Sequence, residues 1–289
     1  MKEAWARWGE EDEAGAVNAI GARQVCDAAA LVREGRAFNL AQPISGATAV
    51  PKHRSGILHL LGRDGGDYAA GARRPGGFQF SEDTIVMPVH SGTHIDALCH
   101  CWYDDQLYNG FSGDTVRSFG AGRCGVDKLP PLVTRGVLLD CVRANGGELV
   151  DGASIGLDLV RKALAAAEAE PREGDAILIR TGWQERQAPG ANVDFNAEPG
   201  IDVEAAEFLA ESGVSVVGAD NFALEALPFP QGKVFPVHQR LIRDYGIPIL
   251  EGLVLGELAQ AGAKTFLFFC APLRIVGGTG SPVAPVAVL

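Results

Sequence analysis

The sequence predicts a mixed α/β protein, with a mixed sheet at its core and helices around it. In the second half of the chain, short apolar runs typical of buried strands alternate with helix-like segments, which is the pattern of α/β folds. Of the 289 residues, 47% are hydrophobic and 21% are charged, which is ordinary globular composition. A chain of this length can bury one sizeable core.

The first part of the chain, residues 1–80, is expected to form an N-terminal extension that packs on the core as a helix and covering loops. A helix is expected near Ala22–Arg33, because Gly35 follows as a stop signal. Residues 37–80 are rich in Gly, Pro and Arg with little periodicity, which indicates long loops with short strands. Residues 81–289 are expected to form the core of the same single domain, because no obvious linker divides the chain.

The core is expected to run through strands and helices in alternation. Asp202 is expected to cap one helix at its start, and Gly213 and Gly246 to follow two helix ends. Strands are expected over Thr84–Asp96, Gly136–Val142, Asp175–Thr181, Val214–Gly218, Ile247–Leu253 and Thr265–Cys270. Helices are expected over Leu157–Glu170, Val203–Ser212 and His238–Tyr245.

Charge and composition narrow the range of partners. The net charge of −11 argues against binding to nucleic acid or to an anionic membrane surface. There is no apolar run of 18 residues and no signal-peptide pattern at the acidic N-terminus, so a cytoplasmic location is expected. The six cysteines form no CxxC pair, and in that compartment they are expected to be reduced thiols.

Three of the six histidines fall within eleven residues, in the segment HSGTHIDALCH from His90 to His100. In an extended strand, His90, His94 and Asp96 would project from the same face, with Gly92 leaving room between the two imidazoles. Two imidazoles and a carboxylate are a common ligand set for Zn²⁺, Mn²⁺ or Fe²⁺. One histidine alone would indicate only a polar residue bonded to backbone, but the whole pattern predicts a metal site.

A metal with an open position activates water and polarises a carbonyl, which are the two needs of amide or ester hydrolysis. His100 could then move the proton, because imidazole titrates near neutrality. Cys99 and Cys101 flank His100 as either thiolate ligands or core residues, and their parity favours the core.

The segment from His90 to His100 closely resembles the HxGTHxDxPxH signature of the cyclase family of metal-dependent hydrolases, which includes kynurenine formamidase and isatin hydrolase. Leu98 stands where the signature has proline. The resemblance covers about residues 80–289 and extends to LIRTGW ending at Trp183, to the segment from Pro236 to Glu251, and to the C-terminal APLRIVGGTGSP.

The resemblance implies a set of site residues. His90, His94 and Asp96 would hold one metal ion, with His100 as the acid/base residue. Asp96, His238 and Glu251 would hold a second ion, Asp96 bridging the two. The resemblance also implies the swivelling β/β/α fold, Mn²⁺ or Zn²⁺ as one or two ions, and a homodimer or homotetramer.

The expected substrate is a small molecule, cyclic or aryl, whose amide, lactam or lactone bond is opened. Trp102, Tyr108 and Trp183 could line a pocket for its ring, although the aromatic residues after the motif could equally be packing residues. The run GGTGS from Gly277 resembles a phosphate cradle but lacks the lysine of a P-loop, so a loop at a substrate edge or interface is expected.

Two alternatives to hydrolysis use the same residues. A lyase, dehydratase or cyclase could use the same metal as a Lewis acid, and its ligands would be identical. A non-catalytic binding or scaffold protein could keep a vestigial site, although the intact ligand set argues against it.

Overall fold

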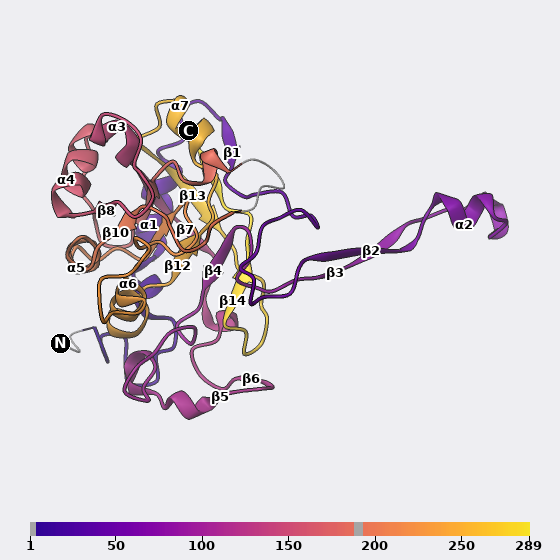
Figure 1. Cartoon of the computed structure of the whole chain (residues 1–289), viewed down its shortest axis with the longest axis horizontal. Coiled ribbons are helices and arrows are strands. Elements are labelled where there is room, and N and C mark those ends of the chain that lie inside the picture. The colour runs from indigo at the N-terminus through magenta and orange to yellow at the C-terminus, as the bar shows by residue number, and fades with distance from the viewer. Residues whose placement is uncertain (1–3, 188–192) are drawn as a thin grey trace.

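The computed structural model describes residues 4–187 and 193–289, and it centres on a nine-stranded sheet (Figure 1). The strand order is β1-β15-β13-β7-β9-β11-β12-β4-β14. The strands are β1 Ala37–Asn39, β4 His94–Asp96, β7 Leu132–Asp140, β9 Ala176–Arg180, β11 Val216–Ala219, β12 Ile249–Glu251, β13 Thr265–Cys270, β14 Gly280–Pro282 and β15 Val286–Val288.

The middle of the sheet is parallel and deeply buried. Strands β7, β9, β11 and β12 run parallel to one another, whereas β13 and β4 join the two sides of this group antiparallel. Residues 176–179 of β9 are Ala-Ile-Leu-Ile and all are buried, as expected for a strand covered on both faces. The mixed sheet with surrounding helices confirms the predicted α/β class.

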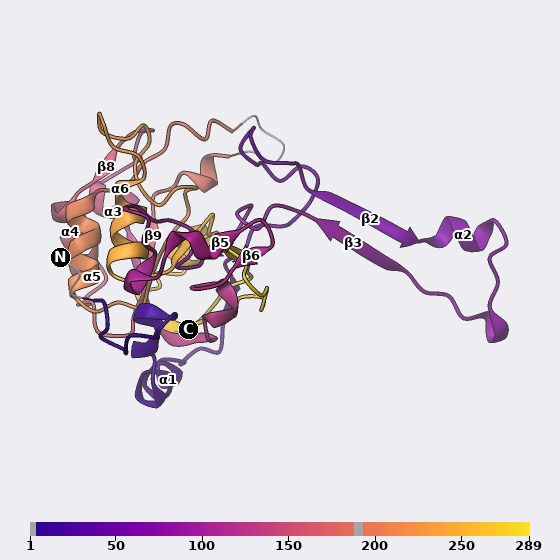
Figure 2. The ribbon, with the colours of Figure 1, turned by 90° about the horizontal axis from the view of Figure 1, so that it is seen from below.

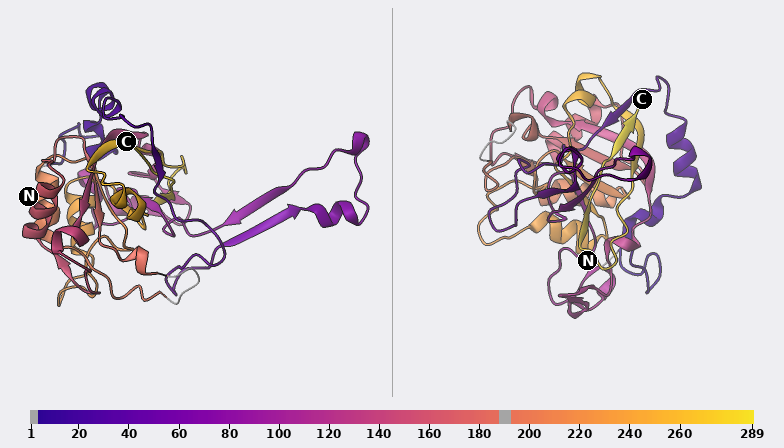
Figure 3. Two further views of the ribbon diagram at one scale, coloured as in Figure 1. Left: turned by 90° about the horizontal axis from the view of Figure 1, so that it is seen from above. Right: turned by 90° about the vertical axis from the view of Figure 1, so that its right-hand side faces the viewer.

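Helices cover the sheet on both sides (Figure 3). Helix α1 contacts β7 and β13. Helix α4 contacts β7, and it also contacts α3 and α5. The helices are α1 Ala22–Ala29, α3 Cys141–Asn145, α4 Leu157–Ala166, α5 Val203–Glu211, α6 Pro236–His238, the π-helical η7 Gln239–Asp244, and α7 Gly256–Gln260.

Most core elements lie where the sequence predicts them, with different bounds. The strand expected over Gly136–Val142 is β7, Leu132–Asp140, and the last two residues of that expected strand belong to α3 instead. The strand Thr265–Cys270 is found with the expected bounds, and Asp202 caps α5 by accepting a hydrogen bond from the Ala205 N–H. The expected strand Thr84–Asp96 is wrong, because the segment is split between β3, Glu82–Val86, and β4. Gly92 separates the two with a φ of +58°, which a continuous strand does not allow.

An arm, defined as residues 58–86, leaves the body of the protein (Figures 1 and 2). Its two strands are β2 Leu58–Arg63 and β3, and α2 Gly65–Ala69 lies at its far end. The expectation that residues 1–80 pack on the core is therefore wrong for residues 58–80. Strand β2 pairs with β3 on its inner edge, and the outer edges of both strands are open to solvent, so the arm forms a ribbon without a place in the large sheet.

Short elements complete the described chain. The short strands are β5 Val116–Arg117, β6 Gly120–Ala121, β8 Ser154–Ile155 and β10 Gly200–Ile201. The 3-10 turns are η1 Gly15–Ala19, η2 Pro75–Gly77, η3 Tyr108–Gly110, η4 Gly113–Thr115, η5 Val126–Lys128 and η6 Gln184–Arg186.

Within the described residues, no helix is both long and apolar enough to cross a membrane.

Candidate metal centre

The centre is built where β4 pairs antiparallel with β12, near one side of the large sheet. His94 and Asp96 are two residues apart in β4 and therefore share a face, and His94 lies opposite Glu251 in the register. His94 Nε2 lies 3.1 Å from Glu251 Oε2 and 3.5 Å from Asp96 Oδ1. All three side chains are buried, so this pairing of strands concentrates two carboxylates and an imidazole away from water.

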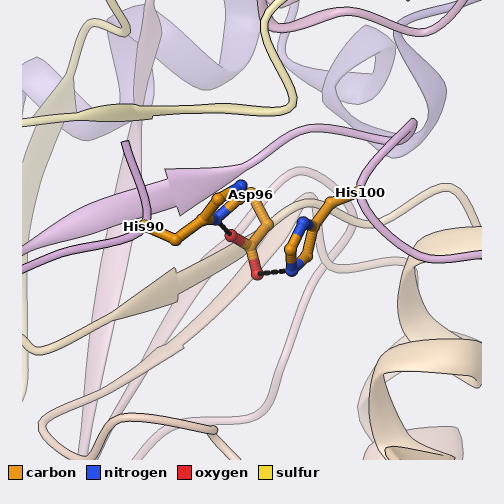
Figure 4. A group of neighbouring side chains, drawn as sticks. All are labelled: His90, Asp96 and His100. Atoms are coloured by element: carbon orange, nitrogen blue, oxygen red, sulfur yellow. Dashed lines mark hydrogen bonds and ion pairs between the residues drawn. The ribbon is translucent and has the colours of Figure 1, made fainter. Parts of the chain in front are cut away.

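His90 reaches the same point from the loop before β4, as Figure 4 shows. Its Nδ1 lies 2.6 Å from Asp96 Oδ1, so Asp96 lies between His90 and His94. The expectation that His90 and His94 share one face of a regular strand is wrong, because the chain bends at Gly92. The bend nevertheless brings the imidazole of His90 to the carboxylate of Asp96.

His238 approaches from α6 on the other side of the two carboxylates. Its Nε2 lies 3.2 Å from Glu251 Oε1 and 3.7 Å from Asp96 Oδ2. The structure therefore brings together all five residues expected to hold metal. It places His94 nearer to Glu251 than to Asp96, so the two expected ligand groups merge into one cluster.

Two of the imidazoles are oriented by partners on the nitrogen that faces away from the carboxylates. His94 Nδ1 lies 3.0 Å from the Gly92 carbonyl oxygen, which can only accept, so Nδ1 carries the proton. His238 Nδ1 lies 2.8 Å from Glu225 Oε1, and the backbone N–H groups of Val237 and His238 also donate to Glu225. Both arrangements direct Nε2 toward the carboxylates, as in metal sites whose ligands are held by a second layer of hydrogen bonds.

The donor set fits a divalent cation. Across the described residues, the buried side-chain atoms that lack a hydrogen-bond partner include His94 Nε2, Asp96 Oδ2 and Glu251 Oε1. Buried polar groups normally make hydrogen bonds. Three buried nitrogen and oxygen atoms without a hydrogen bond in one cluster therefore indicate that a bound cation is their common partner. Two overlapping groups have ligand atoms close enough for one ion each: His94, Asp96 and Glu251, and His90, Asp96 and His100.

The charges in the cluster depend on one another. Burial alone would lower the pKa of His94, but the neighbouring carboxylates of Glu251 and Asp96 raise that pKa above the ordinary value. Burial opposes ionisation of Asp96, yet His100 and His90 hold the pKa of Asp96 well below its usual range. Imidazole protons thus balance the carboxylates here, and a cation would displace them.

His100 lies beside this cluster and differs from the other imidazoles in its surroundings. Its ring stacks on His90 with centroids 3.9 Å apart, and its Nε2 lies 4.0 Å from Asp96 Oδ2 (Figure 4). Burial lowers the pKa of His100 to about 4, against the opposing charge of Asp96. The ring is therefore neutral at physiological pH and can accept a proton.

Two residues from the C-terminal segment support His90, and the sequence did not indicate either role. The Thr279 hydroxyl lies 2.9 Å from His90 Nε2. A Cβ at Gly280 would lie 2.7 Å from both His90 Cε1 and the Ile95 carbonyl oxygen, so only glycine fits there. The GGTGS run, expected as a substrate-edge or interface loop, contributes these two contacts to the centre.

A cavity of about 210 Å³ lies next to the centre. Trp183 and Phe222 line it, and the Phe222 ring lies 6.4 Å from the His94 ring between centroids. The guanidinium of Arg54 lies 5.1 Å from the Phe222 ring centroid and donates a hydrogen bond to the His90 carbonyl. The lining is mostly apolar and comes largely from residues 42–49, 183–187 and Phe195.

The three aromatic residues expected to bind substrate have different surroundings. Trp183 lines the cavity, whereas neither Trp102 nor Tyr108 is among the lining residues. Tyr108 is buried with its hydroxyl donating to Asp12, and it packs against Gly246, so its expected pocket role is corrected to a packing role. Trp102 is partly exposed and packs against Gly113.

The cysteines beside His100 behave as core residues. Burial raises the pKa of Cys99 to about 12 and that of Cys101 to about 11, so both thiols stay protonated. Cys99 belongs to the hydrophobic core and Cys101 packs against that core, which supports the packing interpretation of the CxC pair.

Comparisons with known proteins show the family of the chain. A family model described as putative cyclase matches residues 38–226. The isatin hydrolase of Roseibium aggregatum is 28% identical over 220 residues, which cover 73% of this chain and 75% of that protein. The kynurenine formamidase of Geobacillus thermodenitrificans is 26% identical over 209 residues, covering 69% of this chain and 76% of that protein.

The fold is also shared with a solved structure. A crystal structure described as a novel cyclase is 35% identical to this chain, with a TM-score of 0.91 and coverage of 99% of both chains. The two chains therefore share their fold over almost their whole length.

Proposed function

Because this chain belongs to the putative cyclase family, we propose that it is a metal-dependent hydrolase that opens an amide, lactam or lactone bond of a small cyclic or aryl substrate. One observation carries the proposal, the buried cluster of His94, Asp96, His238 and Glu251. Among the described residues, three side-chain atoms of this cluster are buried without a hydrogen bond. The named hydrolases among the relatives support the reaction class.

His90, His94, Asp96, His238 and Glu251 are the residues that would hold one or two divalent ions, Mn²⁺ or Zn²⁺. Imidazole and carboxylate together suit these ions, and the two groups of closely spaced ligand atoms found among the described residues contain His, Asp and Glu but no cysteine. A divalent ion in such a site supplies Lewis acidity, which lowers the pKa of water and polarises a carbonyl group.

The proton movements fall to His100. It is neutral at physiological pH and partly exposed beside the buried cluster, so it can take a proton from the attacking water. It can then donate that proton to the leaving nitrogen or oxygen. The adjacent Asp96 charge stabilises the imidazolium that exists between these two transfers.

The cavity suits a small substrate with a ring. Its volume of about 210 Å³ lies below the range of about 300–1,000 Å³ of drug-sized pockets. Trp183, Phe195 and Phe222 provide flat apolar surfaces, and the Phe195 and Phe222 rings meet edge to face with centroids 4.7 Å apart. Phe235, whose ring lies 4.8 Å from that of His238, adds a further aromatic surface on the other side of the cluster.

The test is turnover of a panel of lactams, lactones and arylformamides by the metal-loaded enzyme in water enriched in heavy oxygen. We expect at least one substrate to be opened, one solvent oxygen in the new acid, and loss of turnover after chelation. The variant His94→Ala should be inactive, whereas His59→Ala, which changes an exposed histidine in the arm, should retain activity.

Two outcomes would contradict the proposal. Turnover that survives both chelation and the loss of His94 would exclude a metal hydrolase. A product without solvent oxygen would instead indicate elimination or cyclisation at the same centre.

A further inference from the structure

One wall of the cavity comes from a stretch of chain whose charge differs from that of the whole molecule. Residues 35–63 contain no Asp or Glu, although the net charge of the chain is −11. Several residues from 42 to 49 in this stretch line the cavity. Its basic residues are Arg36, Lys52, Arg54 and Arg63. Because a local excess of positive charge attracts anions, this stretch favours an anionic ligand even in an acidic protein.

Arg54 is the basic residue that lies between the cavity and the metal centre. Its guanidinium donates a hydrogen bond to the carbonyl oxygen of His90, one of the proposed metal ligands. The same guanidinium lies 5.1 Å from the ring centroid of Phe222, which lines the cavity. The backbone N–H of Arg54 donates to the Pro51 carbonyl and closes the turn that carries the side chain. The positive charge is thus held next to both the aromatic surface and the ligand cluster.

The charge of Arg54 has no carboxylate partner in the part of the chain that the structure describes. No Asp or Glu oxygen of these residues lies within 4.0 Å of the guanidinium, and only its Nη1 makes a hydrogen bond to them. Burial lowers the pKa of Arg54, against the charges of Glu251 and Asp96, but an arginine remains charged at physiological pH. A half-buried cation without a counter-ion is costly, and an anionic ligand would remove that cost.

We propose that Arg54 binds an anionic group of the substrate, and that the preferred substrate is a cyclic or aryl amide, lactam or lactone with a carboxylate beside the reacting bond. None of the described residues that line the cavity is charged, so the cavity would select the ring and Arg54 would select the charge. The inference rests on the proposed hydrolase function for the reacting bond and adds the charge of the substrate.

The geometry of the guanidinium suits a carboxylate. Its planar fork of N–H groups matches the two oxygens of a carboxylate, and Nη1 alone is used by the His90 carbonyl. A substrate ring that packs on Phe222 would therefore bring an adjacent carboxylate to the remaining N–H groups of Arg54. Because the same guanidinium contacts His90, the bond next to that carboxylate would lie beside the ligand cluster.

A binding experiment on the metal-loaded protein tests the role of Arg54 without turnover. The two probes are benzenesulfonate and methyl phenyl sulfone, which share the ring and the sulfonyl group but differ in charge. Sulfonate is a weak metal ligand, so its charge reports on the guanidinium more than on the bound ions. In isothermal titration calorimetry the wild type should bind benzenesulfonate about 10–100-fold more tightly than the sulfone, the usual effect of a hydrogen bond between charged groups.

Two substitutions at Arg54 separate its charge from its hydrogen bond. Arg54→Gln removes the charge and keeps an N–H donor, so it should bind both probes with similar affinity and keep the metal content of the wild type. Arg54→Lys keeps the charge and should retain part of the preference for benzenesulfonate. The matched control is Arg161→Gln, because Arg161 also lies over a phenylalanine ring, that of Phe208, but is exposed on α4. This control should bind both probes as the wild type does.

Three results would overturn the inference. Equal affinity of the wild type for the two probes would exclude an anion site at the cavity. A preference for benzenesulfonate that survives Arg54→Gln would assign the anion to other groups. Loss of metal, or an equal loss of affinity for both probes, in Arg54→Gln would make Arg54 a structural partner of His90 only.

Turnover separates this inference from the hydrolase proposal. The substrates 2-formamidobenzoate and its methyl ester differ only in the charge beside the formamide bond. The wild type should open the acid with the higher kcat/KM, and Arg54→Gln should lose this preference through a higher KM for the acid. Equal kcat/KM for acid and ester in the wild type would overturn this inference alone. A chain that opens no amide, lactam or lactone, yet binds benzenesulfonate through Arg54, would overturn the hydrolase proposal alone.

Discussion

At the scale of single residues, the centre depends on partners that act through the imidazoles. Glu225 holds His238, the Gly92 carbonyl holds His94, and the Thr279 hydroxyl contacts His90. The sequence could identify His90, His94 and Asp96 because they lie close together in one segment. It could not identify Glu225 or Thr279, because isolated polar residues carry no signal until the fold brings them to a histidine.

The variant His100→Ala tests the proton-transfer role. Turnover should fall by about 10²–10⁴-fold, the usual contribution of a general acid or base. Metal content should remain at the wild-type level, because the five residues proposed to hold the metal are unchanged. If metal content fell in step with activity, His100 would be a ligand and the assignment would be wrong.

The variant Glu225→Gln tests the orientation of His238. Loss of the carboxylate that accepts from His238 should weaken metal binding by about 10–100-fold, the usual effect of removing such a partner. Metal affinity can be measured by competition with a chromophoric chelator. The matched control Glu204→Gln lies exposed on α5 and should bind metal as the wild type does. Equal affinity in both variants would contradict the role of Glu225.

At the scale of elements, regular strands were easier to predict than the path into the site. Thr265–Cys270 is apolar with a clear end at each side, and the structure gives it the same bounds. Residues 84–96 also read as one strand, but the chain turns at Gly92 and contributes its two ends to different sheets. The arm escaped prediction because its pairing of β2 with β3 spans a long connection that has no short turn signature.

The contact of β14 with β4 leads to a prediction for Gly280→Ala. The new Cβ would meet His90 and the Ile95 carbonyl oxygen, so the strands must separate or His90 must move. We expect a loss of about 1–3 kcal/mol of stability, as for overpacking in a core, together with weaker metal binding. In the control Gly147→Ala the new Cβ meets no atom within 4 Å, so neither the stability nor the metal binding should change. Unchanged melting and metal binding in Gly280→Ala would contradict this contact.

Asp220, at the end of β11, gives a prediction for pH dependence. It accepts hydrogen bonds from the Thr181 N–H and hydroxyl and from the Gly182 N–H, and burial raises the pKa of Asp220 to about 6. The folded state therefore binds the proton more tightly than the unfolded state, whose pKa is about 3.9. Stability from this group is full below about pH 4 and is lost as pH rises through about 6.

Chemical denaturation of wild type and Asp220→Asn at several pH values measures this effect. The stability of the wild type relative to the variant should fall by about 2 kcal/mol between pH 4 and pH 7, most of the value that corresponds to the raised pKa. A difference that stays constant, or grows with pH, would contradict the raised pKa.

At the scale of the whole molecule, the centre draws on distant parts of the chain. The sheet places β4 between β12 and β14. This order brings together three segments of the chain: His90 to His100, Glu225 to Glu251, and Thr279 to Gly280. Arg54, just before the arm, also donates to the His90 carbonyl, so the root of the arm and the metal centre are in direct contact. A cluster assembled from so many segments forms only in the folded chain, so ion binding should also stabilise the fold.

The metal centre is tested most directly by the metal content of the chain, measured by elemental analysis of protein purified without added metal. We expect one or two divalent ions per wild-type chain, little metal in His94→Ala, and wild-type content in the exposed control His59→Ala. A wild-type chain without bound metal, or equal metal in wild type and His94→Ala, would contradict the proposed metal centre.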